Sequence, residues 1–212
     1  MIKIADIRKE YKLQTLQEAS VAPNAIEQFG KWWNEAMKSE IDEVNAMTLA
    51  TASPDGKPSA RIVLLKGYDE KGFTFFTNYE SNKAIELANN PQASIVFFWK
   101  ELQRQIRIDG IVEKVSAAES DTYFASRPAG SRIGAWASPQ SKSITREALE
   151  NKYADYEKEF LEKDILRPTF WGGYRIKPQL IEFWQGRPNR LHDRIQYSLQ
   201  KDNSWKIERL AP

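Results

Sequence analysis

Residues 46–69 read AMTLATASPDGKPSARIVLLKGYD, two strand-like runs on either side of the turn sequence PDGK. Apolar and β-branched residues dominate both runs, and a turn containing Asp-Gly between such runs is typical of a β-hairpin. Further strand-like runs follow outward along the chain, at residues 72–78, 93–102 and 104–116. Short strands with turn signals between them predict a mainly antiparallel sheet.

Helical segments interrupt the strands. Residues 23–40 are expected to be helical, with Pro23 in the first turn and an apolar stripe at Ile26, Phe29, Trp33 and Met37. Residues 81–90 predict a short helix that Ser81 caps and Pro91 ends. Two more helices are expected near residues 117–126 and 145–163.

The C-terminal part returns to strand-like runs, at residues 171–178, 179–186, 194–200 and 205–212. Two strand groups flanking a helical section predict an α+β fold, a barrel-like sheet with helices packed outside. Residues 1–22 show weak periodicity and are interpreted as an arm. No linker interrupts residues 23–212, which predicts a single domain.

The composition limits the chemistry. The chain has 212 residues, a formal net charge of +2, no cysteine and one histidine. Thiolate nucleophiles, disulfides, Cys-based metal sites and multi-His metal sites are therefore excluded, so a cofactor must carry any redox chemistry. A general nucleic-acid binder would be more basic, and no apolar run is long enough to span a membrane. Without a signal-like start, a cytoplasmic location is expected.

Positive charge is nevertheless concentrated in three places. Residues 123–146 contain four cations and no acid, residues 57–68 contain three cations and no acid, and the third cluster comprises Arg187, Arg190 and Arg194. Arginine, serine and glycine together suit phosphate binding. Solvated loops with scattered charge are the alternative for any one stretch, and single-stranded RNA is the alternative for all three.

Two strand segments add polar candidates. On a strand, Arg61 and Lys66 would point to opposite faces and could serve different ligands. Gln105 could hydrogen-bond the edge of a heterocycle, or could be an exposed polar residue. If residues 190–194 are extended, Arg190, His192 and Arg194 share one face.

Four stretches together resemble the pyridoxine (pyridoxamine) 5'-phosphate oxidase family: RIVLLKGYDEKGFTFFTN at 61–78, SRPAGSRIGAWASPQS at 126–141, FWGGYRI at 170–176, and IEFWQGRPNRLHDR at 181–194 with the terminal WKIERLAP. The resemblance covers nearly the whole chain. It implies an FMN-dependent split β-barrel, a homodimer with two flavin sites at the subunit interface. The implied reaction oxidises pyridoxamine 5'-phosphate or pyridoxine 5'-phosphate to pyridoxal 5'-phosphate, with oxygen as acceptor and hydrogen peroxide as by-product.

The resemblance also assigns residues. The implied FMN contacts are Arg61, Ile62, Val63, Leu64, Leu65, Lys66, Phe76, Thr77, Lys83, Gln105, Gln140, Ser141, Trp184 and Arg194, with Arg61 and Lys83 on the FMN phosphate. The implied substrate contacts are Arg8, Tyr11, Lys66, Tyr123, Arg127, Ser131, Arg190, Leu191 and His192. Arg190 and His192 are the expected catalytic pair, and the arm that carries Arg8 and Tyr11 would act as a lid. A frayed terminus is the alternative for the arm.

One position departs from the family pattern. Asn82 stands where the family is expected to have an arginine, so one cation for the FMN phosphate is missing. The sequence therefore leaves three alternatives: a split-barrel flavoprotein acting on another substrate, a carrier that binds FMN or pyridoxal 5'-phosphate without turnover, and an RNA-binding module.

Overall fold

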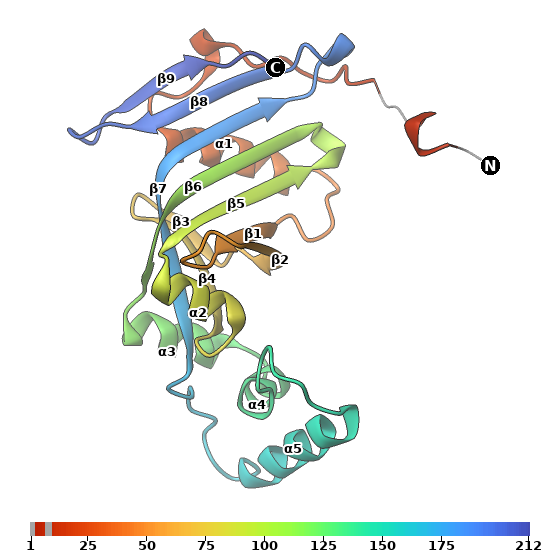
Figure 1. Cartoon of the computed structure of the whole chain (residues 1–212), viewed down its shortest axis with the longest axis vertical. Helices are drawn as coiled ribbons and strands as arrows, with labels where there is room; N and C mark the ends of the chain where they lie inside the picture. The colour runs from red at the N-terminus through yellow and green to blue at the C-terminus, as the bar shows by residue number, and fades with distance from the viewer. Residues whose placement is uncertain (1–2, 7–9) are drawn as a thin grey trace. The chain divides into compact units, whose positions relative to one another are not determined.

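The computed structural model describes residues 3–6 and 10–212 (Figure 1). These residues form two compact units. The first unit contains the described residues up to 49 together with residues 94–110 and 178–212, and the second contains residues 50–93 and 111–177. The prediction of a single domain over residues 23–212 stays a prediction.

The strands form one nine-stranded sheet, in the order β2-β1-β5-β6-β7-β4-β3, with β8 pairing with β7 and β9 with β8. The strands are β1 Ala46–Ala52, β2 Pro58–Leu64, β3 Gly67–Asp69, β4 Gly72–Asn78, β5 Gln92–Trp99, β6 Arg104–Lys114, β7 Trp171–Gln185, β8 Asp193–Leu199 and β9 Trp205–Arg209. The helices are α1 Ala25–Met37, α2 Asn82–Asn89, α3 Ala117–Ser126, α4 Ala129–Ala137 and α5 Arg146–Glu159. The predicted α+β fold with a mainly antiparallel split barrel is confirmed.

Strand β7 is longer than the sequence suggested. Two strands were expected, at residues 171–178 and 179–186, whereas β7 is continuous over 15 residues. Its first part pairs with β4, where Trp171 to Ile176 face Asn78 to Phe73, and its last part pairs with β8. Pro178 lies between these two ladders, so its missing N–H removes no hydrogen bond from either one.

Helix α1 differs from its prediction in register. The side chain of Asn24 accepts hydrogen bonds from the Ile26 and Glu27 amides, so Pro23 precedes the cap and is not in the first turn. The buried stripe consists of Ala25, Ile26, Phe29, Trp32 and Ala36, and Met37 is 57% exposed. Both stripes fit a period of 3.6 residues, and packing against the core selects between them: Trp32 makes an edge contact with Phe183 at 5.2 Å.

Two other helices correct the sequence interpretation. Ser81 occupies the N-cap position of α2 without capping it, because its hydroxyl donates to the Asn78 carbonyl. Helix α4 lies within the stretch that we had interpreted only as a cationic, serine-rich segment. Short 3-10 helices complete the described structure, at Ile4–Asp6, Glu18–Ser20, Lys100–Leu102 and Pro188–Arg190.

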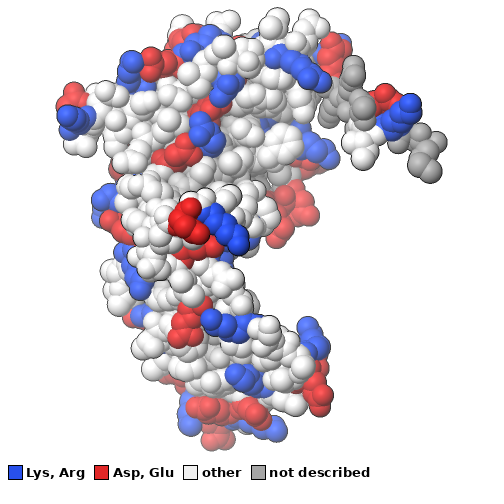
Figure 2. Space-filling model, viewed as in Figure 1, with Lys and Arg blue, Asp and Glu red and all other residues white. Residues whose placement is uncertain are grey.

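The surface agrees with the balanced composition. On the face in view, acidic and basic side chains are interspersed (Figure 2). Among the helices that the structure describes, none has the length and apolar character needed to cross a membrane.

Candidate active site

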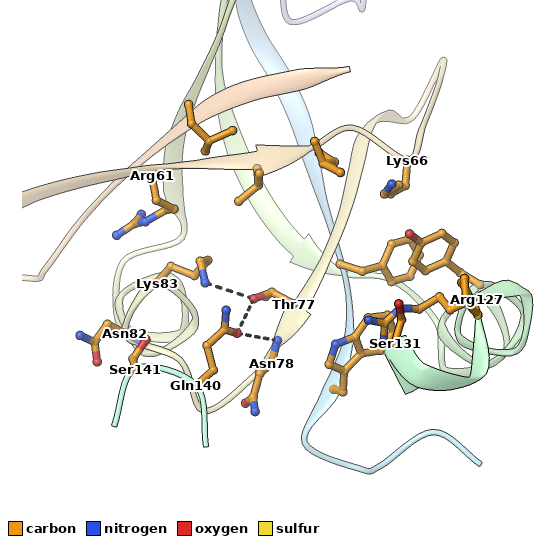
Figure 3. A pocket seen from close by; sticks show the side chains of 17 residues that line it. Arg61, Lys66, Thr77, Asn78, Asn82, Lys83, Arg127, Ser131, Gln140 and Ser141 are labelled. Carbon is orange, nitrogen blue, oxygen red and sulfur yellow. Dashed lines mark hydrogen bonds between the residues drawn. The ribbon is translucent and has the colours of Figure 1, made fainter. Parts of the chain in front are cut away.

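A cavity of about 820 Å³ lies wholly within the second unit. Its lining comes from strands β2 and β4, the starts of α2 and β7, helices α3 and α4, and the segments that follow β2 and α4 (Figure 3). Polar or charged groups gather at two sides: Arg61, Asn82, Lys83 and Ser141 at one, and Lys66, Arg127 and Ser131 at the other (Figure 3). The cavity therefore offers two cationic ends.

Lys83 is the buried cation of the first end. Only 7% of the residue is exposed, and its Nζ donates to Thr77 Oγ1 at 3.2 Å and to Ser81 Oγ at 3.4 Å. Burial lowers the pKa of the ammonium, and the nearby Arg61 guanidinium lowers it further, while Glu86 opposes the shift. An anion bound here would stabilise the charged form of Lys83.

Arg61 is held by hydroxyl groups. Its Nη1 and Nη2 each donate at 2.5 Å, to Thr51 Oγ1 and Ser59 Oγ respectively. Both hydroxyls also bond to the Glu86 carboxylate, which lies 3.5 Å from Arg61 Nη2. Glu86 lies on α2. From the sequence, a role was expected for Lys83 on this helix but none for Glu86.

The loop after α4 closes the first end. Gln140 Oε1 accepts from Thr77 Oγ1 at 3.2 Å and from the Asn78 amide at 3.3 Å. Ser141 has a left-handed backbone, with φ of 70°, and its Oγ accepts from the Asn82 amide at 3.2 Å. Asn82 therefore joins this loop to the start of α2 through its backbone, and its side chain is left at the cavity.

Aromatic rings line the second end. Phe76 and Tyr123 stack with centroids 4.0 Å apart, and Trp171 lies parallel to Phe76 at 5.6 Å. Arg127 lies over the Trp171 ring at 4.7 Å. Its Nη1 is buried without a hydrogen-bond partner in the described part of the chain, and burial lowers the pKa of its guanidinium. Arg127 also lines the cavity, where a guanidinium is suited to an anionic ligand.

Gly173, one of a glycine pair in β7, makes room for this stack. A Cβ on Gly173 would lie 2.7 Å from Phe76 Cε1 and 2.6 Å from Val115 Cγ2. A Cβ on Gly172 would lie 2.2 Å from the Tyr79 hydroxyl oxygen. Phe76 is the direct partner of Gly173 in the β4–β7 ladder, so only glycine lets the ring lie against the strand.

The segment with the single histidine belongs to the first unit, and it is not extended. Pro188–Arg190 form a 3-10 turn in which Asn189 and Arg190 have φ of 55° and 62°, and β8 begins only at Asp193. An extended segment was the condition for Arg190, His192 and Arg194 to share one face, and it is not met, because the left-handed pair turns the chain. His192 Nδ1 accepts the Arg187 amide at 3.1 Å.

His192 has an aromatic setting. Its ring lies 4.6 Å from that of Trp184 and 6.0 Å from that of Tyr11. Burial lowers the pKa of His192, and Arg190 lowers it further against an opposing effect of Asp193. Burial and Arg190 therefore both favour the neutral imidazole.

Arg194 and Gln105 also lie in the first unit. Glu182 is 3% exposed, and its two oxygens accept from Arg194 Nε at 2.7 Å and Arg194 Nη2 at 3.1 Å. Arg107 donates to the same carboxylate at 3.0 Å. These bonds fix the Arg194 guanidinium. Gln105 is half-buried on β6.

The arm is docked from residue 11 onward. Gly186 contacts Tyr11 so closely that a Cβ there would lie 2.7 Å from Tyr11 Cγ. The amides of Lys12 and Leu16 donate to Gln103 Oε1 at 2.9 Å and Asp193 Oδ2 at 3.0 Å. These contacts contradict a frayed terminus for this part of the arm. Arg8 lies outside the described residues.

The structure thus divides the predicted site residues. The cavity of the second unit brings together Arg61, Ile62, Val63, Leu64, Lys66, Phe76, Thr77, Lys83, Tyr123, Arg127, Ser131, Gln140 and Ser141. Tyr11, Gln105, Trp184, Arg190, Leu191, His192 and Arg194 belong to the first unit, and Leu65 is 4% exposed in the core. Sequence reasoning missed Asn78, Pro128 and Trp171 as lining residues. The FWGGYRI motif was the available signal for Trp171.

Two family models match the chain. Residues 33–157 match the family model described as "Pyridoxamine 5'-phosphate oxidase", and residues 171–212 match the "Pyridoxine 5'-phosphate oxidase C-terminal dimerisation region". A pyridoxine/pyridoxamine 5'-phosphate oxidase of Cyanothece sp. is 59% identical over 100% of this chain and 99% of its own.

Solved structures share the fold. PhzG from Burkholderia lata, in complex with tetrahydrophenazine-1-carboxylic acid, has a TM-score of 0.89 and 30% identity over 96% of this chain and 100% of its own. A pyridoxamine 5'-phosphate oxidase-related, FMN-binding protein of Nostoc punctiforme has a TM-score of 0.71 and 19% identity over 91% of this chain and 99% of its own.

The fold defines a protein of the split-barrel class. Within that class, the chain belongs to the pyridoxamine 5'-phosphate oxidase family.

Proposed function

We propose that this chain oxidises pyridoxamine 5'-phosphate and pyridoxine 5'-phosphate to pyridoxal 5'-phosphate, with FMN as cofactor and oxygen as electron acceptor. The observation that carries the proposal is the cavity with a cationic group at each end, Arg61 with Lys83 and Arg127 with Ser131. A flavin mononucleotide and a phosphorylated substrate each bring one phosphate, so two cationic ends are required.

The donor set of the first end fits FMN. Arg61 and Lys83 would hold its phosphate, and a bound anion would stabilise the charged form of the buried Lys83, whose pKa burial lowers. Ser141 Oγ and the Gln140 amide add neutral hydrogen-bonding groups beside them. In this proposal, these groups would offset the missing cation at Asn82.

The second end fits the substrate phosphate. Arg127 Nη1 is a buried donor without a partner in the described chain, and Ser131 and Tyr123 line the same side. A substrate phosphate would complete the hydrogen bonding of Arg127. Lys66, 6.0 Å from the Tyr123 ring centroid, adds a second positive charge.

The chemistry that FMN supplies when bound is two-electron oxidation of the substrate carbon, with oxygen as the final acceptor and hydrogen peroxide as by-product. The chain's own groups position the substrate. Because the Arg187 amide donates to His192 Nδ1, the ring proton lies on Nε2, which would donate to the phenolic oxygen of the substrate. Arg190 would lie over the substrate ring and keep its reacting carbon close to the flavin.

The protein is a homodimer, since its last strands match a dimerisation region. We infer further that each flavin lies at the subunit interface, with the cavity of one subunit completed by Trp184, Arg190, His192 and Arg194 of the partner subunit. The support is the division of the site residues between two units of one chain. The arm that carries Tyr11 would close over bound substrate. For the location of the protein in the cell, we propose the cytoplasm, which the absence of cysteine suits.

A visible spectrum of the FMN-loaded protein, taken without oxygen before and after addition of pyridoxamine 5'-phosphate, tests the function. We expect the flavin band to bleach, and air to restore it as pyridoxal 5'-phosphate forms. A flavin that binds but stays oxidised would instead indicate a carrier or a split-barrel enzyme with another substrate.

A further inference from the structure

Glu86 is a neighbour of Arg61 and is not among the residues that line the cavity. Helix α2 carries it, and 19% of its side chain is exposed. Ser59 Oγ lies 2.9 and 2.7 Å from its two oxygens, and Thr51 Oγ1 donates to Oε2. The carboxylate thus contacts the two hydroxyls that accept the Arg61 fork.

The hydrogen bonds of this network lead from the Arg61 guanidinium, through the two hydroxyls, to the Glu86 carboxylate. Both hydroxyls donate to Glu86, and their oxygens accept from Arg61 Nη1 and Nη2; the two hydroxyl oxygens also lie 3.4 Å apart. Hydrogen bonds in such chains polarise one another, and the carboxylate makes them charge-assisted. Without Glu86, either hydroxyl could turn its proton toward other acceptors, and Arg61 would lose two fixed partners.

We propose that Glu86 is a positioning residue for phosphate binding: through Thr51 and Ser59 it holds the Arg61 guanidinium at the cavity, oriented toward the phosphate of FMN. The inference rests on the proposed function, because it takes this end of the cavity as the FMN phosphate site. It adds an acid to a site that is otherwise cationic.

An acid beside a phosphate site has two opposing effects. Coulomb's law alone says that removing a carboxylate near a bound phosphate tightens binding, because like charges repel. A positioning role for Glu86 instead predicts that removing the carboxylate weakens FMN binding, because Arg61 is no longer held in place. The two effects differ in sign, so one titration separates them.

The experiment is a titration of FMN fluorescence with the flavin-free full-length protein and its variants. We expect Glu86→Gln to raise the FMN Kd about 5- to 20-fold, the range for losing part of a charge-assisted network. Ser59→Ala removes one link and leaves the carboxylate, and we expect it to weaken FMN binding severalfold as well. Glu80→Gln is the matched control: Glu80 is an exposed acid just before the same helix, and its removal should leave the Kd unchanged or lower.

A double-mutant cycle adds a readout that general destabilisation would not reproduce. In an Arg61→Ala background, Glu86→Gln should no longer weaken FMN binding, because there is no guanidinium left to position. An equal weakening in both backgrounds would show that Glu86 acts on the fold and not through Arg61, and would overturn the proposal.

The remaining outcomes of the titration also test the proposal. Unchanged or tighter FMN binding by Glu86→Gln overturns the positioning role while the proposed function stands. If that variant does not fold, Ser59→Ala decides in the same way. Failure of the unmodified chain to bind FMN overturns both this inference and the proposed function.

Discussion

His192 is the residue whose chemistry the structure defines most sharply. Its Nδ1 accepts the Arg187 amide, while Asp193, its neighbour in sequence, is engaged elsewhere by Arg209 and Leu16. Protonation of Nδ1 would place two N–H donors against each other. The local structure therefore favours one neutral tautomer, with the proton on Nε2.

Because the chain has one histidine, ¹⁵N NMR of imidazole-labelled protein reports on this ring alone. We predict an unprotonated Nδ1, a protonated Nε2, and a pKa below the ordinary 6.5, since burial and Arg190 both disfavour the imidazolium. The unfolded chain takes up its proton near pH 6.5, so the native state loses stability as the pH falls below that value.

Arg190→Gln serves as the control for the charge effect. Removing this cation should move the pKa of His192 upward, toward 6.5, and should leave the tautomer unchanged, because the Arg187 amide remains in place. A protonated Nδ1 at pH 7 in the unmodified chain would contradict the assignment.

At the scale of elements, the glycine pair of β7 couples sheet geometry to the substrate end of the cavity. The register sets Gly173 against Phe76, and Phe76 stacks on Tyr123. The space that Gly173 leaves is therefore filled by a ring that lines the site, and the fit of strand to strand determines where Tyr123 lies.

We predict that Gly173→Ala displaces Phe76 and, with it, Tyr123. The new Cβ would lie 2.7 Å from Phe76 Cε1, an overpacking that costs about 1–3 kcal/mol of stability. Steady-state kinetics should show a KM for pyridoxamine 5'-phosphate raised about tenfold, roughly the factor that 1.4 kcal/mol corresponds to. Calorimetry would give the loss of stability.

Gly134→Ala is the matched control. A Cβ there meets nothing within 4 Å, and the residue lies inside helix α4, where alanine is favoured over glycine by about 1 kcal/mol. Stability equal to or above that of the unmodified chain, with unchanged KM, is expected. A normal KM in Gly173→Ala would show that the ring stack does not determine substrate binding.

The elements also show what the sequence could and could not predict. Local signals sufficed for the hairpin of β1 and β2 and for α3, whose bounds the sequence anticipated. The second predicted run of the hairpin was too long, because β2 ends at Leu64 and Gly67–Asp69 form β3, which pairs with β4. They failed for α4, because Pro128 and two glycines resemble loop residues. Its helical state depends on distant packing: Trp136 contacts Tyr156, Phe160 and Phe170.

For the site, too, local sequence signals predicted some residues and missed others. Clusters of arginine and serine indicated phosphate binding near Arg61 and Arg127, and both line the cavity. Nothing in the sequence distinguished Glu86 from an acid on a solvated helix face, because its partners Thr51 and Ser59 are 35 and 27 residues away. The turn at residues 188–190 was missed since neither Asn189 nor Arg190 is a glycine, the usual residue at positive φ.

At the scale of the whole molecule, the distribution of the site residues is the informative feature. Arg127 and the cavity belong to the second unit, and Arg190 and His192 belong to the first. In a symmetric homodimer each site can combine groups from both chains, and two sites then form per dimer. Our interface proposal states that the cavity of one subunit meets residues 184–194 of the partner subunit.

Heterodimers of two inactive variants test that proposal. Arg127→Ala and Arg190→Ala homodimers each carry two damaged sites, so both should turn over slowly while still binding FMN. In a heterodimer of the two, isolated with a different affinity tag on each chain, one site carries both substitutions and the other carries neither. About half of the activity of the unmodified dimer should therefore return. If one chain supplied both groups, each site would keep one substitution, and an inactive heterodimer would show that the subunits do not share the site.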